Sequence, residues 1–156
     1  MTVASPSAAP ERQSARQALM AVLARAGKGE LDAILDQLAP IPAVQDLRAP
    51  EIGLVMLRGR IGGDGAAFNL GEATVSRAAI RLEGGAPGFS YRLGRSPASA
   101  RVAAVIDALW QDEARRAAVE AALVPLRARL AEGAATVRAE TAATKVDFFT
   151  LVRGED

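Results

Sequence analysis

Apolar residues recur with a helical period over the first quarter of the chain. In two consecutive segments they fall at i, i+3, i+4 and i+7, the spacing of one helical face. They are Leu19, Val22, Leu23 and Ala26 in the first segment, and Leu31, Ile34, Leu35 and Leu38 in the second. The pattern predicts a helix that begins near Glu11 or Ser14 and ends at Gly27, then a short helix that Pro40 stops.

From Ile52 onward the period changes to that of a strand. The run from Ile52 to Leu57 is apolar at nearly every position, which predicts a strand buried on both faces. Arg58 and Arg60 share the face of Ile52 within this strand, so that face changes from apolar to charged near the strand's end. The glycines of residues 62–65 then predict a tight turn.

Two further strands are predicted after this turn. In residues 74–82 the apolar side chains alternate with Arg77 and Arg81, and in residues 89–93 aromatic positions alternate with Ser90 and Arg92. The third strand's apolar face holds Phe89, Tyr91 and Leu93. Together the segments predict an antiparallel meander of about three strands with one apolar face.

The helical period returns after Ser96, which precedes Pro97 as a helix start does. Pro125 is expected to kink or divide the long helical pattern that follows. The fold class is therefore α+β, with a small meander packed against N-terminal and C-terminal helices. Residues 1–11 are expected to be disordered, and residues 12–156 to form one domain that ends in an apolar tail, residues 144–156.

Composition removes several classes of chemistry. The chain has no cysteine and no histidine, which excludes disulfides, thiolate metal sites and nucleophile–histidine catalysis within it. The net charge of +1 gives no reason to expect nucleic acid or an anionic membrane as partner. Without a signal peptide or an apolar run long enough for a membrane span, a cytoplasmic location is expected. We predict no catalytic residue and no metal ligand.

Two features remain as candidate sites. Residues 51–101 hold seven arginines and four acidic residues, and Arg58, Arg60 and Arg77 are the candidates for contact with phosphate or a partner. A solvated outer sheet face explains the same excess. In the tail, Phe148, Phe149, Leu151 and Arg153 are candidate partner contacts, since aromatic residues anchor interfaces. The alternative is that the tail packs on its own domain.

The chain resembles the PhnG family of the bacterial carbon–phosphorus lyase system. The resemblance rests on residues 51–82 with their run Leu57-Arg-Gly-Arg-Ile-Gly-Gly-Asp-Gly65, on the ending Thr144-Lys-Val-Asp-Phe-Phe-Thr-Leu-Val-Arg-Gly154, on residues 16–26, and on Gly94-Arg95 followed by residues 105–109. It implies a role in phosphonate catabolism, where a phosphonate displaces adenine from ATP to give a ribose 1-phosphonate 5-triphosphate. It also implies a core complex with PhnI, PhnH and PhnJ, in which PhnI is credited with the substitution and PhnJ cleaves the carbon–phosphorus bond.

The leading hypothesis is a non-catalytic or accessory subunit of this complex that contacts PhnI directly. In this hypothesis MgATP is a substrate of the complex, and the chain itself carries no cofactor. An alternative is a half-site that binds ATP or triphosphate through the sheet arginines. A third is an unrelated stand-alone binding domain.

Overall fold

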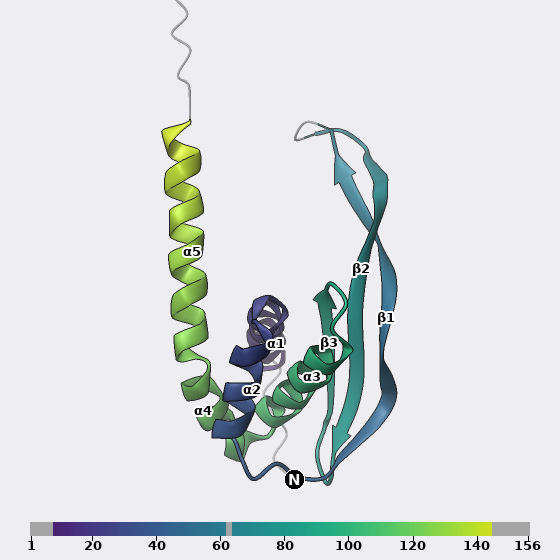
Figure 1. Ribbon diagram of the computed structural model, residues 1–156, viewed down its shortest axis with the longest axis vertical. Helices are drawn as coiled ribbons and strands as arrows, with labels where there is room; N and C mark the ends of the chain where they lie inside the picture. Colours follow the sequence, from purple (N-terminus) through teal and green to yellow (C-terminus); the bar gives the residue numbers. More distant parts are fainter. Residues whose placement is uncertain (1–7, 62–63, 145–156) are drawn as a thin grey trace, which may run out of the picture.

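The structure, a computed structural model, describes residues 8–61 and 64–144. Five helices and three strands occur in this part of the chain (Figure 1). In chain order they are α1 (Ala8–Arg25), α2 (Lys28–Gln37), β1 (Val44–Arg60), β2 (Ala67–Leu82), β3 (Pro87–Leu93), α3 (Pro97–Gln111), α4 (Glu113–Ala122) and α5 (Val124–Ala143). The predicted α+β class and the antiparallel meander, in the order β1-β2-β3, are confirmed.

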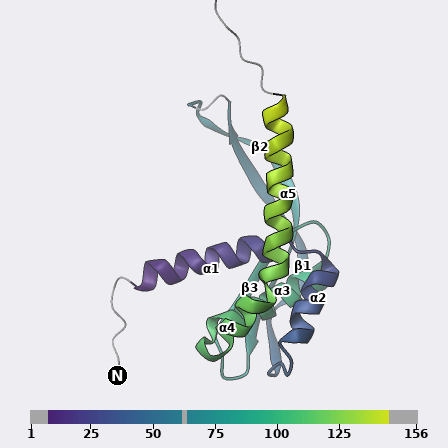
Figure 2. The same cartoon turned by 90° about the vertical axis from the view of Figure 1, so that its left-hand side faces the viewer.

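The helices cover one face of the sheet, as the two ribbon views show (Figures 1 and 2). α3 lies directly on β2 and β3, and α1, α2 and α4 pack around α3. Ala78, Ile80 and Leu82 of β2 point into the core, whereas Arg81 points away, in agreement with the predicted alternation. We call the helix-covered side of the sheet its inner face and the other side its outer face.

On β3 the faces are the reverse of what its apolar residues suggested. Gly88 and Ser90 face α3, and Phe89, Tyr91 and Leu93 lie on the outer face. The reason is the close approach of α3, because a Cβ added at Gly88 would stand 2.0 Å from the carbonyl oxygen of Ala104. Only small side chains fit under the helix here, so the large ones are directed outward.

Polar groups fix the position of β3 against the helices. Arg92 of β3 donates to the carbonyl oxygens of Leu23 and Ala26 at the C-terminal end of α1, where helix carbonyls lack the usual intrahelical donors. Its burial lowers the pKa of Arg92. The hydroxyl of Ser76 on β2 donates to Gly94 O (2.8 Å), which closes the connection from β3 to α3.

The helical segment from α3 to α5 is interrupted at two places. Asp112 ends α3 and caps α4, its carboxylate accepting from the amide of Ala114 at 3.0 Å. Pro125 stands in the first turn of α5, so the predicted division at this proline is confirmed. α5 packs on the body through Leu126 and Leu130, and from Ala131 to Thr144 every residue is exposed.

Two element boundaries differ from the prediction, and one helix cap differs in its hydrogen bond. α1 begins at Ala8, so residues 8–11, which we expected to be disordered, are helical. β1 begins at Val44, earlier than the strand predicted from Ile52, because residues 44–51 also pair with β2, with register shifts between Asp46 and Glu51. Ser96 occupies the cap position of α3, but its hydroxyl bonds that of Ser99 at 2.7 Å rather than a helix amide.

A doubly hydrogen-bonded ion pair ties α5 to α2 and gives a pH-dependent prediction. Arg129 donates to both oxygens of Glu30 (2.6 and 2.8 Å), and the amide of Gly27 donates to the same carboxylate at 2.7 Å. These bonds lower the pKa of Glu30, the bond from Arg129 contributing most. A lowered pKa means that the stabilisation is present above the unfolded-state pKa of about 4.5 and is lost as the pH falls through the folded-state value.

We therefore expect Glu30→Gln to lower the free energy of unfolding by about 0.2–1 kcal/mol at neutral pH, a small effect because both side chains reach solvent. Near pH 3.5, approximately, the variant and the parent should be closer in stability. Urea unfolding at the two pH values measures this. A difference of the same size at both would contradict the ionic origin of the contact.

Candidate partner interface

The hairpin of β1 and β2 extends well beyond the rest of the sheet (Figure 1). The last residue pair between β2 and β3 joins Val75 to Leu93, whereas β1 and β2 continue to pair as far as Arg60 and Ala67. Among the described residues, the distal hairpin is therefore a two-stranded ribbon with both edges unpaired. Such a ribbon is marginally stable alone in water and offers unpaired main-chain groups to a partner.

The inner face of this hairpin carries an uncovered apolar row. Ile52, Leu54 and Met56 lie opposite residues 72–76 of β2, on the inner face of the sheet. Although α3 covers this face nearer the body, the three side chains are 49%, 58% and 53% exposed. The prediction that this strand is buried on both faces is wrong. β1 is an edge strand, and α3 lies mainly on β2 and β3, so nothing in the described residues covers the row.

Two of the predicted arginines continue the same row. Arg58 and Arg60 follow Met56 at alternate positions of β1, and both are exposed. Arg60 also donates to Gly65 O at 3.1 Å, which helps to close the hairpin end. We call Ile52, Leu54, Met56, Arg58 and Arg60 the inner arm surface. The predicted change from an apolar to a charged face is found here.

Arg77 does not belong to this group. It lies on the outer face, paired with Glu51 across the strands (Nε to Oε1 2.7 Å). The hydrogen bond with Glu51 is the main cause that raises the pKa of Arg77. Arg58 is seven residues farther along β1 than Glu51, which is about 23 Å at the usual rise of a strand. The three arginines therefore do not form one phosphate site.

The outer face has an apolar row of its own. Phe89, Tyr91 and Leu93 are 40%, 51% and 76% exposed, and we call them the outer β3 surface. The guanidinium of Arg16 on α1 lies over the Phe89 ring, 5.8 Å from its centre, and leaves the rest of this row exposed. The alternation identified these residues as a face, but it did not show that the face is uncovered.

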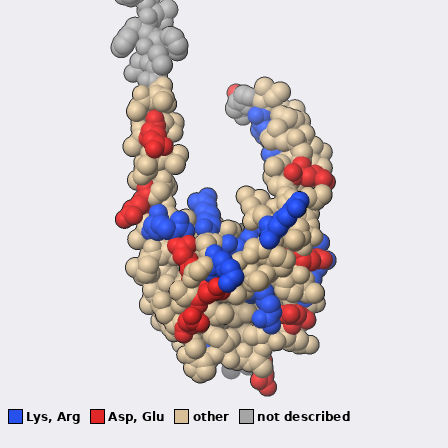
Figure 3. Space-filling model, viewed as in Figure 1, with Lys and Arg blue, Asp and Glu red and all other residues tan. Residues whose placement is uncertain are grey.

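α5 forms a second arm. Between Ala131 and Ala143 it has no buried residue, and Val137 is 60% exposed. A single helical segment of this length is marginal in water without packing. Figure 3 shows an open cleft between the α5 arm and the hairpin arm, with Lys and Arg side chains gathered where the arms meet the body.

The tail candidates lie outside the described residues. Phe148, Phe149, Leu151 and Arg153 all follow Thr144, the last residue that the structure describes. Their role as partner contacts stays a prediction.

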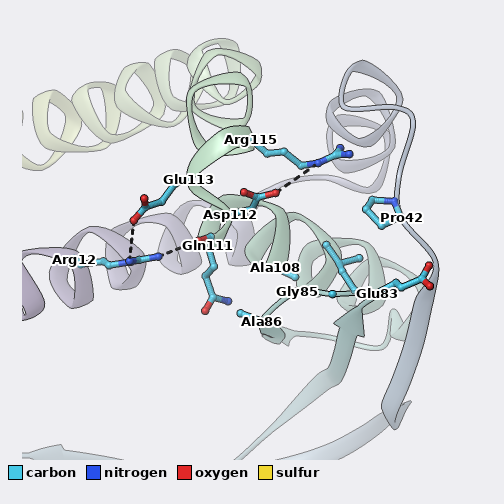
Figure 4. A pocket seen from close by; sticks show the side chains of 12 residues that line it. Arg12, Pro42, Glu83, Gly85, Ala86, Ala108, Gln111, Asp112, Glu113 and Arg115 are labelled. Carbon is cyan, nitrogen blue, oxygen red and sulfur yellow. Dashed lines mark hydrogen bonds and ion pairs between the residues drawn. The ribbon is translucent and has the colours of Figure 1, made fainter. Parts of the chain in front are cut away.

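A pocket of about 420 Å³ lies at the opposite end of the body, beside the turn between β2 and β3 (Figure 4). Its two arginines are already engaged: Arg12 with Glu113 at 3.4 Å, and Arg115 with Asp112 at 3.8 Å. Glu83 adds another carboxylate to the lining. Since three acidic side chains accompany two basic ones, the pocket does not have the charge that polyphosphate requires.

Other kinds of site are absent from the part of the chain that the structure describes. Over residues 8–61 and 64–144, no three acidic side chains come close enough together to hold a metal ion, and no helix is long and apolar enough to cross a membrane. The uncovered arms and the outer β3 surface are therefore the features that remain as candidates.

Comparison with known proteins gives the family. Residues 14–154 match the family model of the phosphonate metabolism protein PhnG. The chain belongs to the PhnG family. A curated member from Rhizobium meliloti (strain 1021), the alpha-D-ribose 1-methylphosphonate 5-triphosphate synthase subunit PhnG, is 54% identical over 137 residues, which cover 88% of each chain. The resemblance inferred from the sequence is confirmed.

The PhnG match includes both projecting arms and nearly all of the tail segment, because it runs from Ser14 to Gly154. The arms are thus within the part of the chain that the family shares, rather than additions to it.

Proposed function

We propose that this chain is a subunit of a ribose 1-methylphosphonate 5-triphosphate synthase and acts in the catabolism of organic phosphonates. The observation that carries the proposal is the 54% identity to a synthase subunit over 88% of both chains. At this identity and coverage the two proteins share their fold, and the arms and the tail segment lie inside the family match.

Within the complex we assign the chain a non-catalytic, supporting role. Displacement of adenine from ATP by a phosphonate needs groups that activate the nucleophile or the leaving base, and histidine is the usual side chain for such proton transfers. The sequence contains no histidine and no cysteine. MgATP would then bind to the complex through other subunits, in the cytoplasm, and this chain would hold no cofactor.

The direct partner in this proposal is PhnI, with PhnH and PhnJ in the same core complex. The support is the shape of the chain, because two arms and an aromatic row expose apolar side chains that a stable monomer would cover. The tail residues Phe148, Phe149, Leu151 and Arg153 are proposed as additional contacts.

The alternative, a half-site for ATP or triphosphate on the sheet arginines, has less support. Arg77 forms an ion pair with Glu51, which also pairs with Arg48, and it lies on the other face from Arg58 and Arg60. Only the pair on the inner arm surface remains for such a role, beside an apolar row that does not suit phosphate.

Co-expression of the chain with PhnI tests the proposal. The full-length chain is expected to co-purify with PhnI and to elute with it as one species in size-exclusion chromatography. Deletion of residues 145–156 should weaken the complex about tenfold or more if the tail supplies aromatic anchors. Phe148→Ala with Phe149→Ala should reproduce most of the loss, whereas Thr150→Ser should not.

If the full-length chain does not associate with PhnI, the subunit role fails. In that case, specific ATP binding by the isolated chain that is lost in Arg58→Ala with Arg60→Ala would favour the half-site instead. A complex that is unaffected by the deletion would keep the subunit role and remove the tail from the interface.

A further inference from the structure

The two arms continue faces that belong to the core of the domain. Leu123, the cap residue of α5, is buried. Within α5, Leu130 is partly buried, and Val137 follows at the same seven-residue spacing but 60% exposed. Residues seven apart lie nearly above one another on a helix. On β1, the apolar row of the inner arm surface likewise continues the inner face of the sheet, which α3 covers within the body. The core-facing side of α5 and the inner face of the hairpin therefore both continue into the cleft, where none of the described residues covers them.

The base of the cleft is basic. Arg25, at the end of α1, lines a hollow of about 270 Å³ together with Leu130 of α5. Arg95 lies at the base of the hairpin, next to Gly94, whose amide donates to Thr74 O at 2.9 Å. With the two arginines of the inner arm surface, four arginines lie in the segments that border the floor and the hairpin side of the cleft. The α5 side carries Arg138 together with Glu132 and Glu140.

None of these four cations forms an ion pair with a carboxylate in the described residues; they are Arg25, Arg58, Arg60 and Arg95. On the distal hairpin, Glu72 is the acidic residue that faces the same way as Met56. Figure 3 shows basic side chains gathered where the arms meet the body, and acidic side chains along the α5 arm.

We propose that the cleft between the arms receives an acidic amphipathic helix of the partner subunit. The helix would extend the layer of helices on the inner face of the sheet beyond α3, over the distal hairpin. Its apolar face would pack on Ile52, Leu54 and Met56. Its acidic residues would meet Arg58 and Arg60 and the basic floor. The proposal rests on the subunit role proposed above and adds the location and chemistry of the contact.

Three considerations select this occupant. The inner arm surface is the side of the sheet that helices cover elsewhere in this fold, so a helix is the element that completes the layer. Four arginines that form no ion pair within residues 8–61 and 64–144 favour an acidic segment over a neutral one. A second copy of this chain that offered its own cleft floor or hairpin arm would bring arginines to the same place, which like charges disfavour, and a small phosphate ligand would leave the apolar row uncovered.

A pair of substitutions on the inner arm surface tests the proposal in the complex with PhnI. Leu54→Glu with Met56→Glu places carboxylates where the apolar face of the helix should lie. We expect PhnI affinity, measured by titration calorimetry, to fall about tenfold or more. Val124→Glu, in the first turn of α5 at the body end of that helix and 60% exposed, is the control and should change the affinity by less than about threefold.

These positions are exposed, so the variants should keep the thermal unfolding midpoint of the parent within about 2 °C, which separates a contact effect from misfolding. A charge test uses Arg58→Glu with Arg60→Glu. Its affinity should fall, and the dependence of affinity on salt should become weaker than in the parent.

The occupant itself is identified by a photo-crosslinking residue at position 54 in the assembled complex. The expected product joins position 54 to a peptide of PhnI with acidic residues and apolar residues at helical spacing. A product with a second copy of this chain, with a peptide of alternating strand pattern, or no product in an intact complex would overturn the proposal.

The two proposals fail in different ways. If the parent chain binds PhnI and the Leu54/Met56 variant binds equally well, the cleft assignment is wrong and the subunit role stands. If the parent chain does not bind PhnI, the subunit role fails and the cleft assignment falls with it.

Discussion

Arg16→Ala is expected to destabilise the fold by about 3–5 kcal/mol. Arg16 on α1 donates to both oxygens of Asp107 on α3 (2.9 and 2.7 Å), and the side chain of Asp107 has no exposed surface. The same carboxylate accepts the amide of Phe89 at 2.9 Å, so it joins α1, α3 and β3. Removal of the guanidinium leaves a buried carboxylate without its cation, which costs far more than the loss of an exposed ion pair.

Urea unfolding, followed by far-UV circular dichroism and by the fluorescence of the buried Trp110, measures this effect. Arg12→Ala is the matched control, because Arg12 lies one turn earlier on α1 and pairs with the exposed Glu113. It should lower stability by no more than about 1 kcal/mol. Equal effects of the two substitutions would mean that Asp107 gains little from Arg16 and is held by Phe89 and its other donors alone.

The ion pair of Arg16 and Asp107 was not predicted from the sequence, although the position of Asp107 in the sequence indicates that it needs a partner. Asp107 is the single charged residue in the apolar run from Val102 to Trp110, and a carboxylate inside such a run requires a partner. The sequence does not show which of the chain's arginines supplies it, because Arg16 lies 91 residues away. Contacts between distant elements depend on how the helices pack, which local periodicity does not contain.

Element types were predictable because they follow from local patterns. The helical period found α1, α2 and the inward side of α3, and alternation found the faces of β2. The strand at Ile52 shows the limit of this reasoning. A continuous apolar run has the same appearance whether the domain's own residues or a partner cover the strand. The prediction from sequence therefore placed the arginines of this strand correctly on one face, but its prediction that the strand is buried was wrong.

The candidate site divides in the same way. Parity along β1 correctly grouped Arg58 and Arg60 with the apolar row. Arg77 was grouped with them only because it is an arginine in a strand nearby, and the register places it on the other face, beside Glu51. Strand register is a long-range property, so the composition of the segment could not separate these residues.

The second large expected effect concerns the contact that reversed the faces of β3. Gly88→Ala is expected to destabilise the protein by about 3 kcal/mol or more, at the upper end for overpacking. The added Cβ would stand 2.0 Å from Ala104 O and 2.8 Å from the Cβ of Ala108. The obstacle is helix backbone rather than a flexible side chain, so α3 must move away from β3. The thermal unfolding midpoint and the urea midpoint should both fall.

Gly133→Ala supplies the opposite case within the same chain. Gly133 lies inside α5, and a Cβ there meets nothing within 4 Å. Alanine should therefore stabilise the helix by about 0.5–1 kcal/mol through the lower entropy of the unfolded chain. Because both substitutions replace glycine by alanine, comparing them separates the steric clash of the added Cβ from the change in conformational entropy of the unfolded chain. If Gly88→Ala were as harmless as Gly133→Ala, α3 would not lie against β3 as closely as the structure has it, and the outward direction of Phe89 and Tyr91 would need another cause.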